Sequence, residues 1–131
     1  MKYKKLNNFI IYLIVLFIFI FDVITPLGIA SGTPYGLAVS LTLWSEKSKN
    51  TYYVSILAIL LTALGYLLSS EVISPHYAVF INRILAVVII IVSAVFVIHQ
   101  RKLNKQIEEL SVISTTDPLT HIGNRLAFDL E

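Results

Sequence analysis

The sequence contains no cysteine and few charged residues. The absence of cysteine excludes a disulfide framework, a thiolate metal site and a cysteine nucleophile. Only 14% of the 131 residues are charged, whereas a soluble domain carries about a quarter. Hydrophobic residues make up 56% of the chain, and its mean hydropathy is +0.80. So short a chain with so few charges cannot cover itself with polar surface, so most of it is expected in a bilayer.

The charges are confined to a few places. Asp22 is the only charged residue between Leu6 and Ser45, and ranges 50–70 and 84–98 contain none. By contrast, the last 33 residues hold nine charges. We therefore predict a membrane domain over residues 1–98 and an aqueous part that begins at His99.

Four apolar segments have about the 20 residues that a helix needs to cross a bilayer. They are residues 6–24, 27–44, 51–69 and 77–98. Each must be helical, because lipid offers no partner to a free backbone N–H or C=O group. The expected fold class is all-α: an integral membrane bundle of four transmembrane helices, continued by a helix outside the membrane.

The basic residues predict the orientation. They precede the first segment, lie between the second and third, and follow the fourth: Lys2, Lys4, Lys5, Lys47, Lys49, Arg101, Lys102 and Lys105. The loops around residues 25 and 73 contain no lysine or arginine. Because basic loops stay in the cytoplasm, both termini are expected there, in a multi-pass protein.

Two alternatives remain open at the N-terminal side. Basic residues, an apolar run and Gly28-Ile29-Ala30 together are also typical of a cleaved secretory signal. In the second segment, Gly28, Gly32 and Gly36 share one face if a helix begins at Leu27, which would let another helix approach closely. However, Thr33-Pro34 is also a good helix start. A helix from Pro34 is too short to span, and the alternative is therefore a re-entrant or bent segment.

Asp22 and Arg83 are the ionisable residues nearest the hydrocarbon. A charge there is costly unless it pairs or reaches the interface. We consider both: an Asp22–Arg83 pair across two helices, or two side chains that each reach the outer interface separately. Neither residue type nor spacing decides between them.

The fourth segment is expected to continue as a helix over residues 99–113, which contain no glycine or proline. Phe96, Leu103 and Leu110 recur every seven residues, and Ile107 lies between the last two. This is a short heptad seam, which favours a parallel coiled coil between two copies of the chain. The expected partners are the lipid bilayer and a second copy, and no nucleic acid.

Residues 114–131 form a polar segment, "STTDPLTHIGNRLAFDLE". Its motif residues are Asp117, Leu119, Thr120, Asn124, Arg125 and Phe128. In identity and spacing they resemble the opening of a GGDEF domain, the diguanylate cyclase module of bacteria. His121 stands where glycine is common, and Gly123 fills a variable spacer position. The membrane segments are similar to four-helix modules that precede bacterial histidine kinases and cyclases.

This resemblance implies a parent protein in the bacterial inner membrane that joins two GTP into cyclic di-GMP with Mg²⁺, as a homodimer. The GGDEF loop and the metal-binding carboxylates of the family follow later in its sequence. None is present here, so we assign no catalytic, cofactor-binding or metal residue to this chain. Residues 114–131 would be the truncated start of the catalytic domain.

Two other functions remain open. Pro118-Leu119-Thr120 also occurs in the phosphoacceptor helix of histidine kinases, but the required histidine is replaced by Ile113 or Ser114. A small four-helix transporter uses a carboxylate in its first helix, for which Asp22 is the candidate. The next stretch of reading frame distinguishes the three functions.

Overall fold

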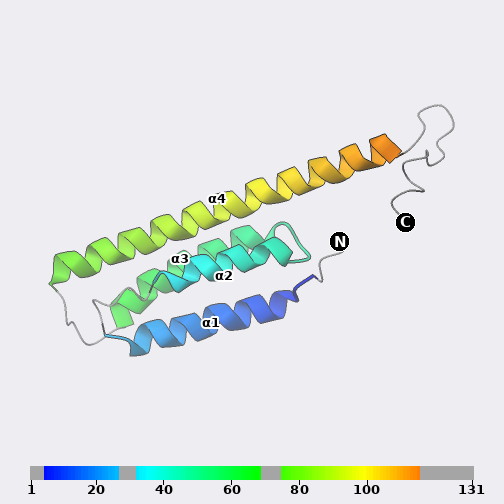
Figure 1. The fold of residues 1–131 in the computed structure, drawn as a ribbon. Helices are drawn as coiled ribbons and strands as arrows, with labels where there is room; N and C mark the ends of the chain where they lie inside the picture. The colour runs from blue at the N-terminus through cyan, green and yellow to red at the C-terminus, as the bar shows by residue number, and fades with distance from the viewer. Residues whose placement is uncertain (1–4, 27–31, 69–74, 116–131) are drawn as a thin grey trace. The chain divides into compact units, whose positions relative to one another are not determined.

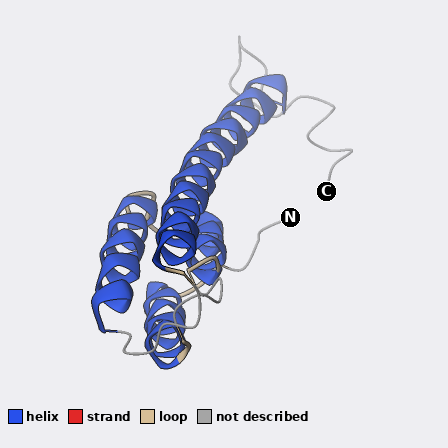
Figure 2. Cartoon of the chain, turned by 90° about the vertical axis from the view of Figure 1, so that its left-hand side faces the viewer, coloured by secondary structure: helices blue, strands red, loops and turns tan. Residues whose placement is uncertain are grey.

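The computed structural model describes residues 5–26, 32–68 and 75–115, apart from the side chains of residues 114 and 115. Over these ranges the chain forms α1 (Asn8–Ile24), α2 (Pro34–Leu41), a 3₁₀ turn (Thr42–Trp44), α3 (Asn50–Leu68) and α4 (His76–Thr115) (Figure 1). The described part contains no strand, only an isolated bridge between Leu6 and Ser45. The expectation of an all-helical chain is therefore confirmed for this part (Figure 2).

Helix boundaries follow from local sequence. The Asn7 side chain accepts a hydrogen bond of 3.0 Å from the backbone N–H of Phe9, which caps the start of α1. Thr25 is extended and precedes Pro26, which disfavours helix in the residue before it. Pro34 occupies the first turn of α2, where its missing N–H costs no hydrogen bond.

The second apolar segment differs from the helix expected over residues 27–44. Gly32 and Thr33 form a turn and α2 begins at Pro34, so no continuous helix runs from Leu27. At about 1.5 Å per residue, α2 is about 12 Å long and cannot span a bilayer alone. Residues 27–31, including Gly28, lie outside the described residues. Of the two alternatives, the shorter helix that begins at Pro34 is therefore the correct one.

The chain divides into two compact units, residues 1–98 and 99–131. In the first unit, α1, α2 and α3 pack against one another around a core that includes Ile11, Val15, Tyr35 and Val54. The buried face of α3 is rich in small and polar residues at helical spacing, among them Thr51, Ser55, Ala58, Thr62 and Gly65. Small residues of this kind let helices approach closely.

The outer faces of the helices are apolar and exposed. Phe9 and Phe17 of α1 are each 69% exposed, and Leu67 of α3 is 76% exposed. A soluble monomer rarely exposes contiguous apolar surface on this scale. Among the described residues, Asn50–Leu68 and His76–Ile113 are long and apolar enough to cross a membrane, and α1 is a shorter apolar helix of 17 residues. These observations indicate association with a membrane.

Distant parts of the first unit meet at two ends. At one end the N–H of Leu6 donates a 2.8 Å hydrogen bond to the carbonyl of Trp44, so the start of α1 lies beside the end of the 3₁₀ turn. At the other end Gly65 of α3 lies against the carboxylate of Asp22, near the end of α1. The chain therefore reverses direction between α1 and α2.

Helices α2 and α4 approach closely at Gly36. A Cβ atom on Gly36 would lie 2.5 Å from Cγ2 of Ile89 and 3.2 Å from Oγ of Ser93. The Ile89 methyl cannot move away easily, because a β-branched side chain in a helix is held in one χ1 rotamer. Glycine is therefore required here by the packing of α4.

We predict that Gly36→Ala lowers the thermal stability of the purified chain in detergent, measured by circular dichroism. Helix propensity alone would give the opposite sign, because alanine stabilises a helix by about 0.5–1 kcal/mol relative to glycine. The control is Leu37→Ala, since Leu37 is 72% exposed and lies next in the chain. A more stable Gly36→Ala variant would contradict the close approach.

Candidate functional site

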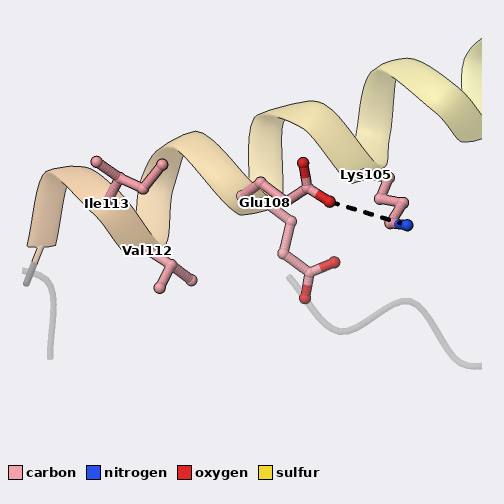
Figure 3. A pocket seen from close by; sticks show the side chains of 5 residues that line it. Lys105, Glu108, Val112 and Ile113 are labelled. Atoms are coloured by element: carbon pink, nitrogen blue, oxygen red, sulfur yellow. Dashed lines mark ion pairs between the residues drawn. The ribbon is translucent and has the colours of Figure 1, made fainter.

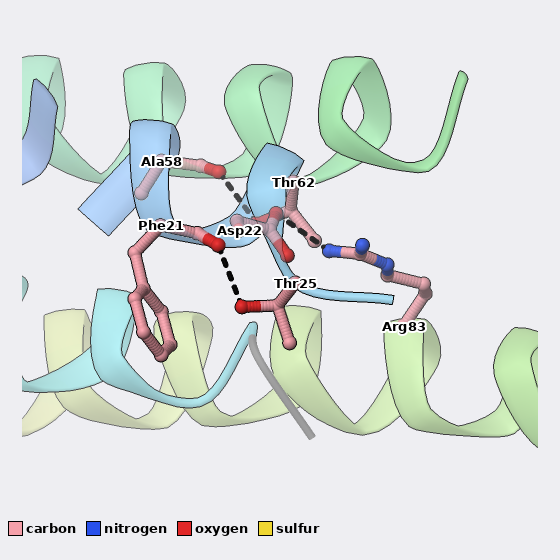
Figure 4. Close-up of polar contacts among 6 residues, drawn as sticks. All are labelled: Phe21, Asp22, Thr25, Ala58, Thr62 and Arg83. Carbon is pink, nitrogen blue, oxygen red and sulfur yellow. Dashed lines mark hydrogen bonds and ion pairs between the residues drawn. The ribbon is translucent and has the colours of Figure 1, made fainter. Parts of the chain in front are cut away.

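The most distinctive polar feature of the first unit is an ion pair between α1 and α4. Nη1 of Arg83 donates to Oδ2 of Asp22 at 2.7 Å (Figure 4). The Asp22 side chain is completely buried and that of Arg83 is 13% exposed. The structure therefore brings together the two residues for which the sequence left pairing and separate solvation both open. Burial of both charges makes the pair costly to break, since either partner alone would be left unpaired in a medium of low dielectric.

Two glycines and a threonine surround the pair. A Cβ atom on Gly65 would collide with Oδ2 of Asp22 and lie 3.8 Å from Nη1 of Arg83. A Cβ atom on Gly32 would lie 2.6 Å from Cβ of Ala86 and 3.7 Å from both Nη1 of Arg83 and Cγ2 of Thr62. The ion pair is thus enclosed at positions where a larger side chain would not fit. We call Asp22, Arg83, Gly32, Thr62 and Gly65 the ion-pair cluster.

Tyr35 of α2 is a buried polar group beside this cluster. Its side chain is completely buried, and within the described part of the chain its hydroxyl has no hydrogen-bond partner. The backbone N–H of Tyr35 donates to the carbonyl of Gly32 at 3.4 Å, which places Tyr35 next to a glycine of the cluster. An unsatisfied buried hydroxyl costs about 1–3 kcal/mol, so Tyr35 is an exception to the usual pairing of buried polar groups. All four helices therefore contribute to this region.

A second polar group lies at the opposite end of α1. Oδ1 of Asn8 accepts hydrogen bonds from Ser45 (2.5 Å) and from Nδ2 of Asn50 (3.2 Å), and the Tyr12 hydroxyl donates to Oδ1 of Asn50 at 2.8 Å. We call Asn8, Tyr12, Ser45 and Asn50 the asparagine cluster. Its side chains bond mainly to one another, which indicates that it fixes α1 against α3 and the segment between α2 and α3.

These clusters were only partly predictable. Asp22 and Arg83 stand out in the sequence as isolated charges. Tyr35, Thr62, Gly65 and the asparagine cluster did not, although the small and polar residues of α3 recur with helical spacing. A polar residue on the same helical face as a glycine was the available signal.

The predicted seam residues are exposed. Leu103, Ile107 and Leu110 are 37%, 64% and 65% exposed, and Phe96, in the first unit, is 54% exposed. Among the described residues, a depression beside them is lined by Lys105, Glu108, Glu109, Val112 and Ile113 of α4 (Figure 3). Lys105 and Glu109 form an exposed ion pair of 3.8 Å there, which contributes little to stability.

Burial lowers the pKa of the Arg101 guanidinium, near the start of the second unit. It stays charged at neutral pH, because the ordinary pKa of arginine is far above 7. The GGDEF-like residues Asp117, Leu119, Thr120, Asn124, Arg125 and Phe128 lie outside the described residues. Within the described ranges, no group of three or more histidines, cysteines or carboxylates is placed to hold a metal.

We predict that Asp22→Asn and Arg83→Gln each destabilise the folded chain by about 3 kcal/mol or more, because each leaves a buried partner uncompensated. The double variant should cost less than the sum of the two, which measures the coupling between them. Circular dichroism monitors unfolding in detergent. It gives the free energy of unfolding of the natural chain, of each single variant and of the double variant.

The matched control is Glu109→Gln, which breaks the exposed pair with Lys105 and should cost less than about 1 kcal/mol. Additive effects of Asp22→Asn and Arg83→Gln would show that the pair does not hold α1 to α4.

Comparison with known proteins identified no relative: no family model matches the sequence, and searches of the curated proteins and of the solved structures found no match.

Proposed function

We propose that this chain is the membrane sensory and anchoring region of a bacterial diguanylate cyclase, followed by the first residues of its GGDEF domain. The observation that carries the proposal is the motif from Asp117 to Phe128, whose six characteristic residues occur at the family's spacing. The motif begins two residues after α4 ends at Thr115. A long helix directly before the catalytic domain suits a protein that transmits a signal to it.

In this proposal the chain crosses the inner membrane four times with both termini in the cytoplasm. Two contacts in the structure support helices that cross the membrane in alternating directions. Leu6 bonds to Trp44 at one end of α1, and Asp22 pairs with Arg83 near the other end. Exposed Lys5, Lys47 and Lys49 belong to the first of these ends, which supports a cytoplasmic position for that end.

The second crossing would be built around α2. α2 supplies about 12 Å of helix, which is less than the depth of a bilayer core. Tyr35, Ala38 and Val39 of α2 are buried in the first unit.

The ion-pair cluster is the element through which a stimulus would act. Arg83 lies seven residues into α4, about 10 Å along the helix from His76. A signal that breaks or moves the Asp22–Arg83 pair would shift α4 against α1, and α4 is the helix that leads to the GGDEF motif. Interfaces of this type have discrete packing arrangements, so a small local change can switch the helix between them.

Transmission would occur in a homodimer. With Ile107 at position a, Leu103 and Leu110 fall at position d, a combination that favours two parallel strands. Lys105 and Glu109 fall outside this seam. The seam side chains are exposed in the chain, so they are available to a second copy.

The two alternatives are less well supported. A kinase sensor would need a histidine at residue 113 or 114, and the chain has Ile113 and Ser114. A cation-coupled transporter would need a carboxylate that a cation can reach, whereas Asp22 is fully buried and paired with Arg83.

The decisive experiment for the function is to express the natural reading frame that contains this chain and measure cyclic di-GMP in the cells. We expect the frame to continue into a GGDEF loop and the nucleotide to rise above the vector control. A variant with the second acidic residue of that loop replaced by alanine should abolish the rise. A stop codon after Glu131, or a kinase domain, would overturn the proposal.

The four-crossing topology predicts cytoplasmic readings for reporter fusions after Ser48 and Lys105, and a periplasmic reading after Ile73. Alkaline phosphatase and green fluorescent protein fusions give opposite signals on the two sides, so each position is measured twice. A periplasmic reading at Ser48 or Lys105 would contradict the topology.

The dimer predicts disulfide formation between copies of the chain carrying one cysteine in the seam. The natural sequence contains no cysteine, so the background is clean. Under mild oxidation in native membranes, Leu103→Cys, Ile107→Cys and Leu110→Cys should give covalent dimers on non-reducing gels. Lys105→Cys and Glu109→Cys are the controls, and equal yields at all five positions would exclude a specific seam.

A further inference from the structure

A groove between α3 and α4 lies beside the ion-pair cluster. Its volume is about 330 Å³, and its walls are almost entirely apolar. Ala63, Tyr66, Phe80 and Val87 are among the lining residues, and Tyr66 and Phe80 are 39% and 60% exposed. The groove is therefore open on its outer side, where lipid would be in a bilayer. Its volume is at the lower end of the range of about 300–1,000 Å³ that is usual for ligand sites.

Among the described residues, three side chains that line this groove carry polar atoms: Thr62, Tyr66 and Arg83. Oγ1 of Thr62 donates its proton to the carbonyl of Ala58 at 2.8 Å, so toward a ligand it can act only as an acceptor. Arg83 carries five N–H donors, and its bond to Asp22 uses Nη1. Among the described lining residues, Arg83 and the Tyr66 hydroxyl are therefore the hydrogen-bond donors, and the charged Arg83 is the stronger of the two.

The charge balance determines the type of acceptor. Asp22 and Arg83 together are neutral, so an anion bound to Arg83 would leave one uncompensated negative charge at a site of low dielectric. A carbonyl oxygen accepts from the guanidinium without adding charge. The exposed rings of Tyr66 and Phe80 on the two helices add a surface on which a flat ring packs favourably.

We propose that this groove binds a neutral, flat, lipid-soluble carbonyl compound, of the quinone or aryl ketone class, whose oxygen accepts a hydrogen bond from Arg83. The ring lies between α3 and α4, and its alkyl substituent extends into the surrounding lipid. A ligand on Arg83 competes for the guanidinium that holds α1 to α4. The site belongs to the membrane unit and holds whether or not a cyclase domain follows it.

The test uses the whole chain in phosphatidylcholine nanodiscs and an alkylated benzophenone as the probe, since this aryl ketone forms covalent bonds with nearby C–H groups under light. Mass spectrometry of the digested protein locates the adducts. We expect saturable labelling confined to residues 59–67 and 80–87. Decylubiquinone should compete, whereas decylbenzene, which has no oxygen, should not. Decanoate should compete at least about tenfold more weakly than the quinone.

Val87→Phe fills the groove without replacing a residue of the ion-pair cluster, and it should reduce the labelling of residues 59–67 and 80–87 at least about tenfold. Val92→Phe adds the same ring at an exposed position of α4 outside the groove and should label like the natural chain. Ala63→Trp fills the groove from α3 and provides a second blocking variant if Val87→Phe does not fold, which circular dichroism reveals.

Three results would overturn the proposal. Equal competition by decylbenzene would mean that the groove takes any apolar chain. Stronger competition by decanoate would make it an anion site. Labelling that spreads over the lipid-facing residues, and that neither Val87→Phe nor Ala63→Trp reduces, would mean that the probe only partitions into the lipid.

Discussion

The buried ion pair between Asp22 and Arg83 is the constraint on which the first unit depends. Its two residues are 61 positions apart, on α1 and α4, and the 2.7 Å contact fixes these helices to each other. Gly32 and Gly65 are needed around it because any larger side chain would collide with the pair or its neighbours. Thr62 and Tyr35 extend the polar region to α3 and α2. Separating a charged pair in apolar surroundings is costly, because each displaced charge would remain buried without compensation.

Each of the two polar clusters holds the helices together at one end of the first unit. The asparagine cluster closes one end of the unit with hydrogen bonds between neutral groups, whereas the ion-pair cluster closes the other with charges. Neutral hydrogen bonds tolerate small displacements at modest cost, but a buried ion pair does not. In the proposed function, a stimulus would therefore act at the ion-pair cluster. This asymmetry supports placing the sensory end at Asp22 and Arg83, away from the basic residues that mark the proposed cytoplasmic side.

In the proposed mechanism, the groove receives the signal and α4 carries it to the GGDEF-like motif. Arg83 belongs to both the ion pair and the groove, so occupancy of the groove and the position of α4 are linked through one guanidinium. α4 then runs without interruption to Thr115, two residues before the GGDEF-like motif begins. A continuous helix is an effective connector because it cannot absorb a shift locally as a loop would.

The sequence by itself determined the helical class and the apolar character of the segments, because composition and charge distribution act locally along the chain. It also identified Asp22, Arg83 and the exposed seam as candidates. Only the tertiary structure decided that Asp22 and Arg83 pair, that α2 begins at Pro34, and that Tyr35, Thr62 and Gly65 surround the pair. These outcomes depend on which helix faces meet. Which faces meet is decided by the fit of glycines against side chains on other helices, and a local sequence pattern does not predict this fit.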